Sequence, residues 1–417
     1  MARVAGRFTR VESRRTARRM VAGLASELPN KNCWTLSEQA GDDTPDAMQN
    51  LLSRASWDTE GVGADLRGYV VEHLGGTDAI LVVDETGDLK KGTHTVGTQR
   101  QYTGTAGRIE NAQVAVHLTY STDMGHTFID RALYLPKSWT EDAQRCAAAG
   151  IPDDTTFATK PALATRMITE ALDAGVPARW VTGDEVYGAD PALRKELETR
   201  EVAYVLAIGR DRRVDTATGP ARPDTLAAEL PKQAWQRLSA GDGAKGPRIY
   251  DWAWIDVNTD TAATGCRWLL VRRNPNSGEL AYYRCYAPHP VPLSALVAVA
   301  GRRWAVEEDF QSGKGLAGLD EHQVRRWTSW HRWTMLSMLA LALLTVLAAR
   351  ERAAQPAPEG LIPLTRNEIQ HLFVTFLIRP ILDIGLRLRR SIWRRRHQQR
   401  AKTSHYRRRS EQARVAR

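Results

Sequence analysis

The chain has 417 residues and a formal net charge of +10, so it is long enough for two or three domains and a large core. The positive charge is concentrated at the ends: residues 1–20 carry +6 and residues 386–417 carry +12, which leaves −8 between them. Basic ends on an acidic body indicate an anionic partner such as nucleic acid, with disordered solubilising tails as the alternative.

The four cysteines, Cys33, Cys146, Cys266 and Cys285, lie far apart and form no CxxC pair. This spacing argues against a zinc site and a disulfide framework, and it suits a reducing cytoplasm. The N-terminus is rich in Arg but has no apolar signal-peptide core. The most apolar run, residues 335–349, is shorter than the ~20 residues that cross a bilayer. We therefore predict a buried helix there and a cytoplasmic protein.

Residues 13–75 have a helical pattern. Two short helices, 34–40 and 45–54, are predicted on either side of the turn 41–44, which ends in a Thr N-cap followed by Pro. Such a pair is typical of helix-turn-helix DNA-binding proteins and also of plain helix packing, and both interpretations stay open.

From residue 79 the pattern changes to alternating strands and helices. The predicted elements are a buried strand at 79–84, a polar loop at 87–107, antiparallel strands at 111–120 and 127–135, a helix at 160–174, a strand at 179–184, a helix at 191–200 and a strand at 203–208. Two of these strands end in an acid, Asp84 and Asp184. Functional sites of α/β sheets gather at the carboxyl ends of strands, so both acids are candidate site residues.

The pattern from residue 209 to about 290 consists of short alternating strands with several Trp and Tyr, separated by Gly-, Pro- and Asn-rich turns. It predicts an all-β insertion. Helical periodicity returns at residue 291 and continues through Glu307. A long helix at 326–350, a shorter one at 366–378 and the basic tail complete the chain.

A third carboxylate, Glu307, lies on a predicted helix between two cations, Arg303 and Lys314, on one helical face. The adjacent Glu308 is about 100° around the helix from that face. Carboxylate oxygens are natural ligands of Mg²⁺ and Mn²⁺, and two such ions clamp the attacking and leaving oxygens of a displacement at phosphorus. The three acids therefore predict metal-dependent phosphoryl transfer on DNA, with the cations facing the phosphates.

The stretches around the acids are VVDETG at Asp84, VTGDEVYG at Asp184 and RWAVE at Glu307. Together with the order of elements, they resemble the DDE-type insertion-sequence transposases whose third acid belongs to a Tyr–Arg–Glu–Lys motif. The resemblance covers roughly residues 78–350. The Tyr expected three residues before Arg303 is Ala300 here, which leaves open how the motif contacts the flanking strand.

The resemblance implies an α/β protein with an RNase H-like core, a mixed sheet with flanking helices, interrupted by the all-β insertion. The expected parts are a helical N-terminal DNA-binding region at 1–76, the first part of the core at 77–209, the β-rich insertion at 210–290, the second part of the core with the Glu307 helix at 291–352, and a C-terminal helical and basic tail at 353–417.

The resemblance also implies roles for individual residues. Asp84, Asp184 and Glu307 would be the catalytic metal ligands, for Mg²⁺ or Mn²⁺ with two ions per site. Arg303 and Lys314 would hold phosphates near the cut.

Further basic residues follow Asp84. Lys90, Lys91, Arg100 and Arg108 lie in or beside a Gly-containing loop, where they either reach DNA phosphates or form a charged turn.

In the β-rich segment, Trp254, like Trp252 and Trp268, either stacks a flipped base, as the insertion does in hairpin-forming relatives, or packs in the core. Glu85 and Glu185 each follow a predicted ligand, and strand alternation points them away from it, so each is expected either to support the ligands from behind or to face the solvent.

These inferences predict a cut-and-paste DNA transposase that hydrolyses element ends and transfers the strands into target DNA. The expected partner is double-stranded DNA, both the terminal inverted repeats and the target. A homodimer is expected because two ends have to be held together. The Ala- and Arg-rich composition suggests a GC-rich bacterial source. For a DNA-acting protein of this kind, a cytoplasmic and nucleoid-associated location is expected. The alternatives are a catalytically silent DNA-binding regulator derived from such an enzyme and a nuclease on the same core.

Overall fold

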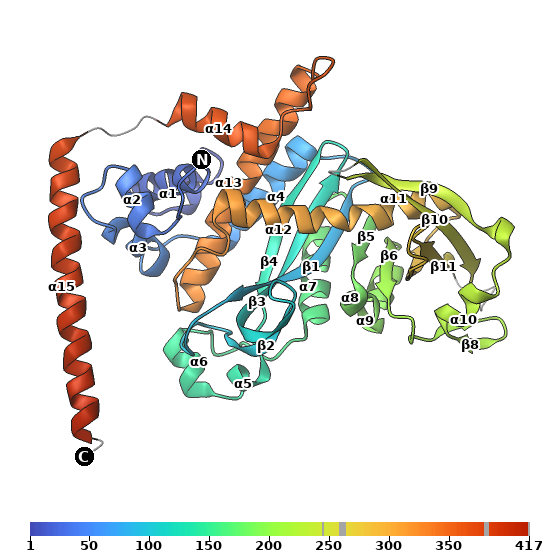
Figure 1. The fold of residues 1–417 in the computed structure, drawn as a ribbon, viewed down its shortest axis with the longest axis horizontal. Helices are drawn as coiled ribbons and strands as arrows, with labels where there is room; N and C mark the ends of the chain where they lie inside the picture. Colours follow the sequence, from blue (N-terminus) through green and yellow to red (C-terminus); the bar gives the residue numbers. More distant parts are fainter. Residues whose placement is uncertain (244–245, 258–263, 379–382, 416–417) are drawn as a thin grey trace.

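The computed structural model describes residues 1–243, 246–257, 264–378 and 383–415. In these residues a mixed sheet of ten strands is surrounded by helices, and a long C-terminal helix extends from the body (Figure 1). The helices are α1 (Val11–Leu24), α2 (Cys33–Gln39), α3 (Asp46–Ser53), α4 (Thr59–Leu74), α5 (Lys137–Thr140), α6 (Ala143–Ala149), α7 (Lys160–Asp173), α8 (Glu185–Gly188), α9 (Pro191–Thr199), α10 (Pro223–Ala228), α11 (Leu293–Arg302), α12 (Trp304–Ala317), α13 (Trp327–Ala354), α14 (Arg366–Leu377) and α15 (Ile384–Val415). The strands are β1 (Ile80–Leu89), β2 (Gln99–Thr103), β3 (Arg108–Thr122), β4 (Gly125–Leu133), β5 (Trp180–Gly183), β6 (Ala203–Ile208), β7 (Val214–Thr216), β8 (Gly219–Ala221), β9 (Gln236–Gly243), β10 (Gly246–Asp256), β11 (Cys266–Arg273) and β12 (Leu280–Ala287).

The central strands confirm the predicted RNase H-like core. Strand β3 pairs antiparallel with both β4 and β1, and β1 then pairs parallel with β5, which pairs parallel with β6. The first four residues of β1, Ile-Leu-Val-Val, are all buried, as expected for a central strand covered on both faces. Helices α7 and α12 both pack against β1, β3 and β4, so β1, which carries Asp84, is in contact with both helices.

The strands of the β-rich segment continue this sheet. Strand β12 pairs antiparallel with β6, and β11, β10 and β9 follow in that order. The short helix α10 and the separate β7–β8 hairpin belong to the same segment. The insertion is therefore joined to the core through the edge strand β6 and extends the sheet on that side (Figure 1).

The helical pattern that continued through Glu307 is divided into α11 and α12, which meet at Arg303. The carbonyl of Gly301 accepts a hydrogen bond from the Arg248 side chain of β10 at 3.2 Å. A side chain at Gly301 would also collide with β9, because a Cβ there would lie 1.9 Å from the Ala240 carbonyl oxygen. The contact with β9 and β10 thus lies at the boundary between α11 and α12, where Arg303 itself keeps a helical backbone conformation.

Helix α13 packs against α1, α3, α4, α12, α14 and β4, and so joins the N-terminal helices to the core. One hydrophobic cluster accordingly includes Leu24, Leu66, Val83 and Leu341. Among the described residues, α13 alone is long and apolar enough to cross a membrane, and 83% of its most apolar window is buried inside the protein.

Candidate active site

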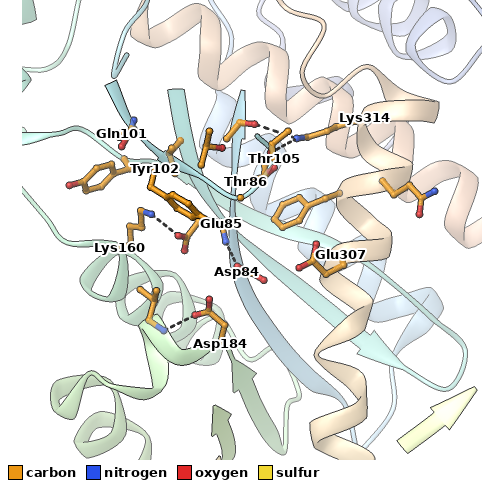
Figure 2. A pocket seen from close by; sticks show the side chains of 18 of the residues that line it. Asp84, Glu85, Thr86, Gln101, Tyr102, Thr105, Lys160, Asp184, Glu307 and Lys314 are labelled. Atoms are coloured by element: carbon orange, nitrogen blue, oxygen red, sulfur yellow. Dashed lines mark hydrogen bonds and ion pairs between the residues drawn. The ribbon is translucent and has the colours of Figure 1, made fainter. Parts of the chain in front are cut away.

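A cavity of about 880 Å³ opens beside β1 and the end of β5, and α12 lines it as well. Asp84, Asp184, Glu307, Arg303 and Lys314 all line this cavity. Figure 2 shows the three carboxylates, which come from three different parts of the chain. The structure thus brings together the five residues that the sequence placed at the reaction centre.

Asp84 and Asp184 are neighbours because of the strand register. The parallel pairing of β1 with β5 ends at Val83 and Gly183, and the two acids are the next residues of their strands. The prediction that the strand ends at Asp84 was wrong, since β1 continues to Leu89 along β3. Asp184 does follow the end of β5, where its side chain accepts a hydrogen bond from the Val186 N–H at 2.8 Å.

The two acids have little positive charge around them. Asp84 is 7% exposed, and its burial, followed by the charge of Asp184, raises its pKa well above the ordinary value. The compensating groups are the Glu85 N–H, 2.7 Å from Oδ1, and the Arg303 guanidinium, 3.7 Å from Oδ2. Burial and then the charge of Glu85 raise the pKa of Asp184 as well. A pair of this kind is stabilised by a cation placed between the carboxylates.

Glu307 projects from α12 toward Asp84 across the cavity (Figure 2). Its neighbour Glu308 also lines the cavity, but its carboxylate pairs with His126 Nε2 at 3.1 Å. Among the described residues, no three His, Cys, Asp or Glu side chains stand close enough together to hold one metal ion. Asp84 and Asp184 therefore fit a cation as a pair, while Glu307 faces them without completing a ligand set in this conformation.

A sequence-family match covers the part of the chain that contains Asp84 and Asp184. The sequence model of the DDE superfamily endonucleases matches residues 3–244, more than half of the chain, and the match includes Asp84 and Asp184. The chain belongs to the DDE superfamily endonucleases.

Individual relatives of this DDE endonuclease chain are more distant. Over 203 residues it is 27% identical to the probable transposase for insertion sequence element IS701 of Microchaete diplosiphon, which covers 48% of this chain and 50% of that protein. The chain thus matches about half the length of that relative. Among solved structures, a piggyBac transposase synaptic complex with hairpin DNA aligns with a TM-score of 0.44 and 14% identity, covering 92% of this chain and 76% of that chain.

The other basic residues predicted to contact DNA do not line the cavity of this DDE endonuclease. Lys90 is turned inward: its Nζ donates to the His322 carbonyl oxygen at 3.3 Å, and burial lowers its pKa. Lys91, Arg100 and Arg108 are exposed on the surface, and Arg108 pairs with a nearby glutamate at 2.9 Å. Lys314 does reach the cavity, as Arg303 does, and its Nζ lies 3.5 Å from the Gly87 carbonyl oxygen.

Trp254 is also absent from the cavity lining. It is partly buried and stacks on Trp268, with ring centroids 5.4 Å apart. The exposed aromatic side chains that do line the cavity are Tyr102 on β2 and Trp304 on α12, and neither was singled out from the sequence. Trp304 lies within the RWAVE stretch, so its position beside Arg303 was the available signal.

For Glu85, sequence reasoning predicted a role in supporting the ligands or facing the solvent, but it missed the direction of the side chain and its partners. Alternation along β1 predicted that Glu85 faces away from the site, but it lines the same cavity as Asp84. Strand β5 ends at Gly183, so β1 has no parallel neighbour at these two positions and both side chains reach the open edge. The carboxylate of Glu85 accepts hydrogen bonds from Lys160 and Tyr187, which lie 75 and 102 residues further along the chain. No local spacing could signal these contacts.

Proposed function

We propose that the chain is a DNA transposase that cuts an insertion sequence out of double-stranded DNA and joins its ends to target DNA. The observation that supports this best is the Asp84–Asp184 pair. The strand register makes the two carboxylates neighbours, few positive charges lie near them, and they share one open cavity with Glu307. The similarity to a probable insertion-sequence transposase supports the same reaction.

In this proposal Asp84, Asp184 and Glu307 hold Mg²⁺ or Mn²⁺, with two ions per site. When bound, such ions activate the attacking water and stabilise charge on the attacking and leaving oxygens. The side chains of the protein position the DNA around them. Arg303, beside Asp84, and Lys314, further along α12, neutralise the phosphates that flank the cut. Positioning and charge stabilisation are what phosphoryl transfer requires of a protein.

Helix α15 would supply much of the DNA affinity. It carries twelve Lys and Arg and one Glu, and it extends beside α2 and away from the body (Figure 1). Its exposed Arg395, Arg396 and Arg400 form no ion pair within the described part of the chain. Its first turns are anchored, because the buried Arg390 donates to the Trp34 carbonyl oxygen of α2 at 2.9 Å. Affinity from such a helix is expected to fall steeply with salt.

The N-terminal helices would take part in the same binding. On α1, Arg14, Arg15 and Arg18 lie on one exposed helical face. We therefore assign element-end binding to residues 1–76 and 353–417, and the reaction to 77–209 and 291–352. Because two ends have to react together, we propose a homodimer in the active complex.

The test is cleavage and strand transfer of a labelled duplex that carries the element end, with Mg²⁺ or Mn²⁺, for the native chain and Asp184→Asn. The transposase is supported if the native chain cuts and joins while the variant binds DNA and does neither. Cleavage without joined product would instead assign a nuclease on the same core. Binding without reaction under either metal would assign a DNA-binding regulator.

A further inference from the structure

One carboxylate ties together the two chain segments that carry Asp84 and Asp184. Glu85 Oε1 accepts from Lys160 Nζ at 2.6 Å, and Glu85 Oε2 accepts from the Tyr187 hydroxyl at 2.6 Å. Glu85 follows Asp84 on β1, and Tyr187 lies in α8, three residues after Asp184. Tyr187 is fully buried, so its hydroxyl has a defined direction.

The side-chain bridge through Glu85 connects two segments that are not joined there by backbone hydrogen bonds. The parallel pairing of β1 with β5 stops at Val83 and Gly183, so no ladder hydrogen bond holds Asp184 against Asp84. On its other side, the segment after Asp184 packs closely against β6. The approach is so close that a Cβ at Gly188 would lie 1.9 Å from the Ala207 carbonyl oxygen. Two carboxylates that repel each other are thus held by one side-chain bridge on one flank and by β6 on the other.

The same hydrogen bonds give Glu85 a different role from that of the proposed metal ligands Asp84 and Asp184. Both of its carboxylate oxygens are engaged, one by an ammonium group and one by a hydroxyl group. Lys160 partly offsets the negative charge of Glu85, which raises the pKa of Asp184. Figure 2 shows Lys160 and Glu85 side by side next to Asp84.

We propose that Glu85, held by Lys160 and Tyr187, is a positioning residue that sets the separation of Asp84 and Asp184 and thereby the affinity of the site for a divalent cation. The proposal rests on the proposed function in one respect, the assignment of Asp84 and Asp184 as cation ligands. Groups that orient metal ligands typically change metal affinity by about 10- to 100-fold when they are removed.

The chain offers a matched control for the bridge. Glu198 accepts hydrogen bonds from the Tyr204 hydroxyl at 2.7 Å and from Arg267 at 2.6 Å, and Tyr204 is buried. This second Tyr–Glu–cation bridge has the same chemistry but does not line the cavity. Tyr204→Phe therefore removes an equivalent hydrogen bond from the fold without touching the site.

The experiment is a titration of the full-length chain with Mn²⁺, followed by the electron paramagnetic resonance signal of the free ion. We expect Tyr187→Phe and Glu85→Gln to weaken Mn²⁺ binding by about tenfold or more, while Tyr204→Phe binds as the native chain does. In the cleavage assay the two bridge variants should need more metal for half-maximal rate and approach the native rate at saturating metal. Circular dichroism confirms that each variant is folded.

Equal Mn²⁺ affinity in the native chain and Tyr187→Phe would overturn the proposal, as would loss of affinity in Tyr204→Phe to the same degree. A native chain that binds no Mn²⁺ at millimolar concentration would overturn it too. If the bridge variants lose affinity as expected but the native chain neither cuts nor joins DNA, the transposase proposal fails while the role of the bridge stands.

Discussion

Two buried carboxylate clusters lie on different sides of α12, and they differ in charge balance rather than in burial. Asp309 is 0% exposed and Asp84 is 7% exposed. Burial opposes the ionisation of Asp309, but His126 and Arg366 outweigh it and lower the pKa of that carboxyl. At Asp84 the burial is reinforced by the charge of Asp184, and the pKa rises well above the ordinary value.

The contacts explain the contrast. Asp309 is paired with His126 Nδ1 at 2.8 Å and Arg366 at 2.5 Å, and accepts from the Thr119 hydroxyl at 3.0 Å. The nearest cation to Asp84 is Arg303 at 3.7 Å. Burial therefore does not distinguish a structural acid from a candidate ligand, whereas an uncompensated negative charge does.

The two clusters are also linked through α12 itself. Glu307 and Asp309 are two residues apart, so they point about 200° apart around the helix. Asp309 ties α12 to β3, β4 and α14, while Glu307 faces the cavity. The charge-balanced cluster around Asp309 (the saturated cluster) thus holds α12 in place. The same helix presents Glu307 to the Asp84–Asp184 pair.

The largest expected effect is that of Asp184→Asn on activity. The substitution removes a proposed cation ligand, so DNA cleavage should fall by about 10³-fold, the scale of losing one contact to transition-state charge. Thermal stability without metal should rise, because Asp84 loses a repelling neighbour. Cleavage rates and melting temperatures measure the two effects. A variant that is both inactive and less stable than the native chain would contradict this account of the pair.

Asp309→Asn should have the opposite profile, with its main effect on stability. The change leaves Arg366 and His126 without their buried counter-charge, which typically costs about 3–5 kcal/mol. Urea unfolding followed by circular dichroism measures the loss. The matched control is Asp153→Asn at an exposed position, which should stay within about 0.5 kcal/mol of the native chain. A loss below about 1 kcal/mol for Asp309→Asn would mean that the cluster is not the structural anchor described here.

Divalent metal should stabilise one cluster and leave the other unaffected. At a metal concentration of 100 times its Kd, binding to the folded chain adds about 2.7 kcal/mol of stability. We therefore expect the melting temperature of the native chain to rise with added MgCl₂ or MnCl₂. Asp184→Asn should abolish the rise and Asp153→Asn should preserve it. An equal rise in all three chains would place the metal elsewhere.

The fold and the positions of the acids followed from the sequence because both depend on local pattern. The buried run at Ile80–Val83 and the order of strands and helices were predicted from local pattern, and the resemblance that they support implied the RNase H-like core. Strand register places Asp84 beside Asp184. The face shared by Arg303, Glu307 and Lys314 needed nothing more than helical spacing, and all three line the cavity.

The features that the sequence did not predict depend on contacts between distant parts of the chain. At the boundary between α11 and α12, the Gly301 carbonyl oxygen accepts from Arg248 of β10, which lies 53 residues earlier in the chain. Lys90 is turned inward by His322, 232 residues away, so a charged residue in a Gly-containing loop is not free to meet DNA. No periodicity or spacing encodes such pairings, and they decide which of the predicted basic residues remain available.

The smallest expected effect concerns the pH dependence of the saturated cluster. Burial opposes protonation of His126, but Asp309 and Glu308 outweigh it, so its pKa is raised above the ordinary 6.5. The stability from this group is fully present below pH 6.5 and is lost as the pH rises through the folded-state pKa. Over this increase in pH, the free energy of unfolding should fall in the native chain by on the order of 1 kcal/mol more than in His126→Gln. Urea unfolding at each pH measures the difference. His94→Gln, at an exposed position, should keep the native slope. Identical slopes in all three chains would mean that His126 is neutral in the fold and that Arg366 alone balances Asp309.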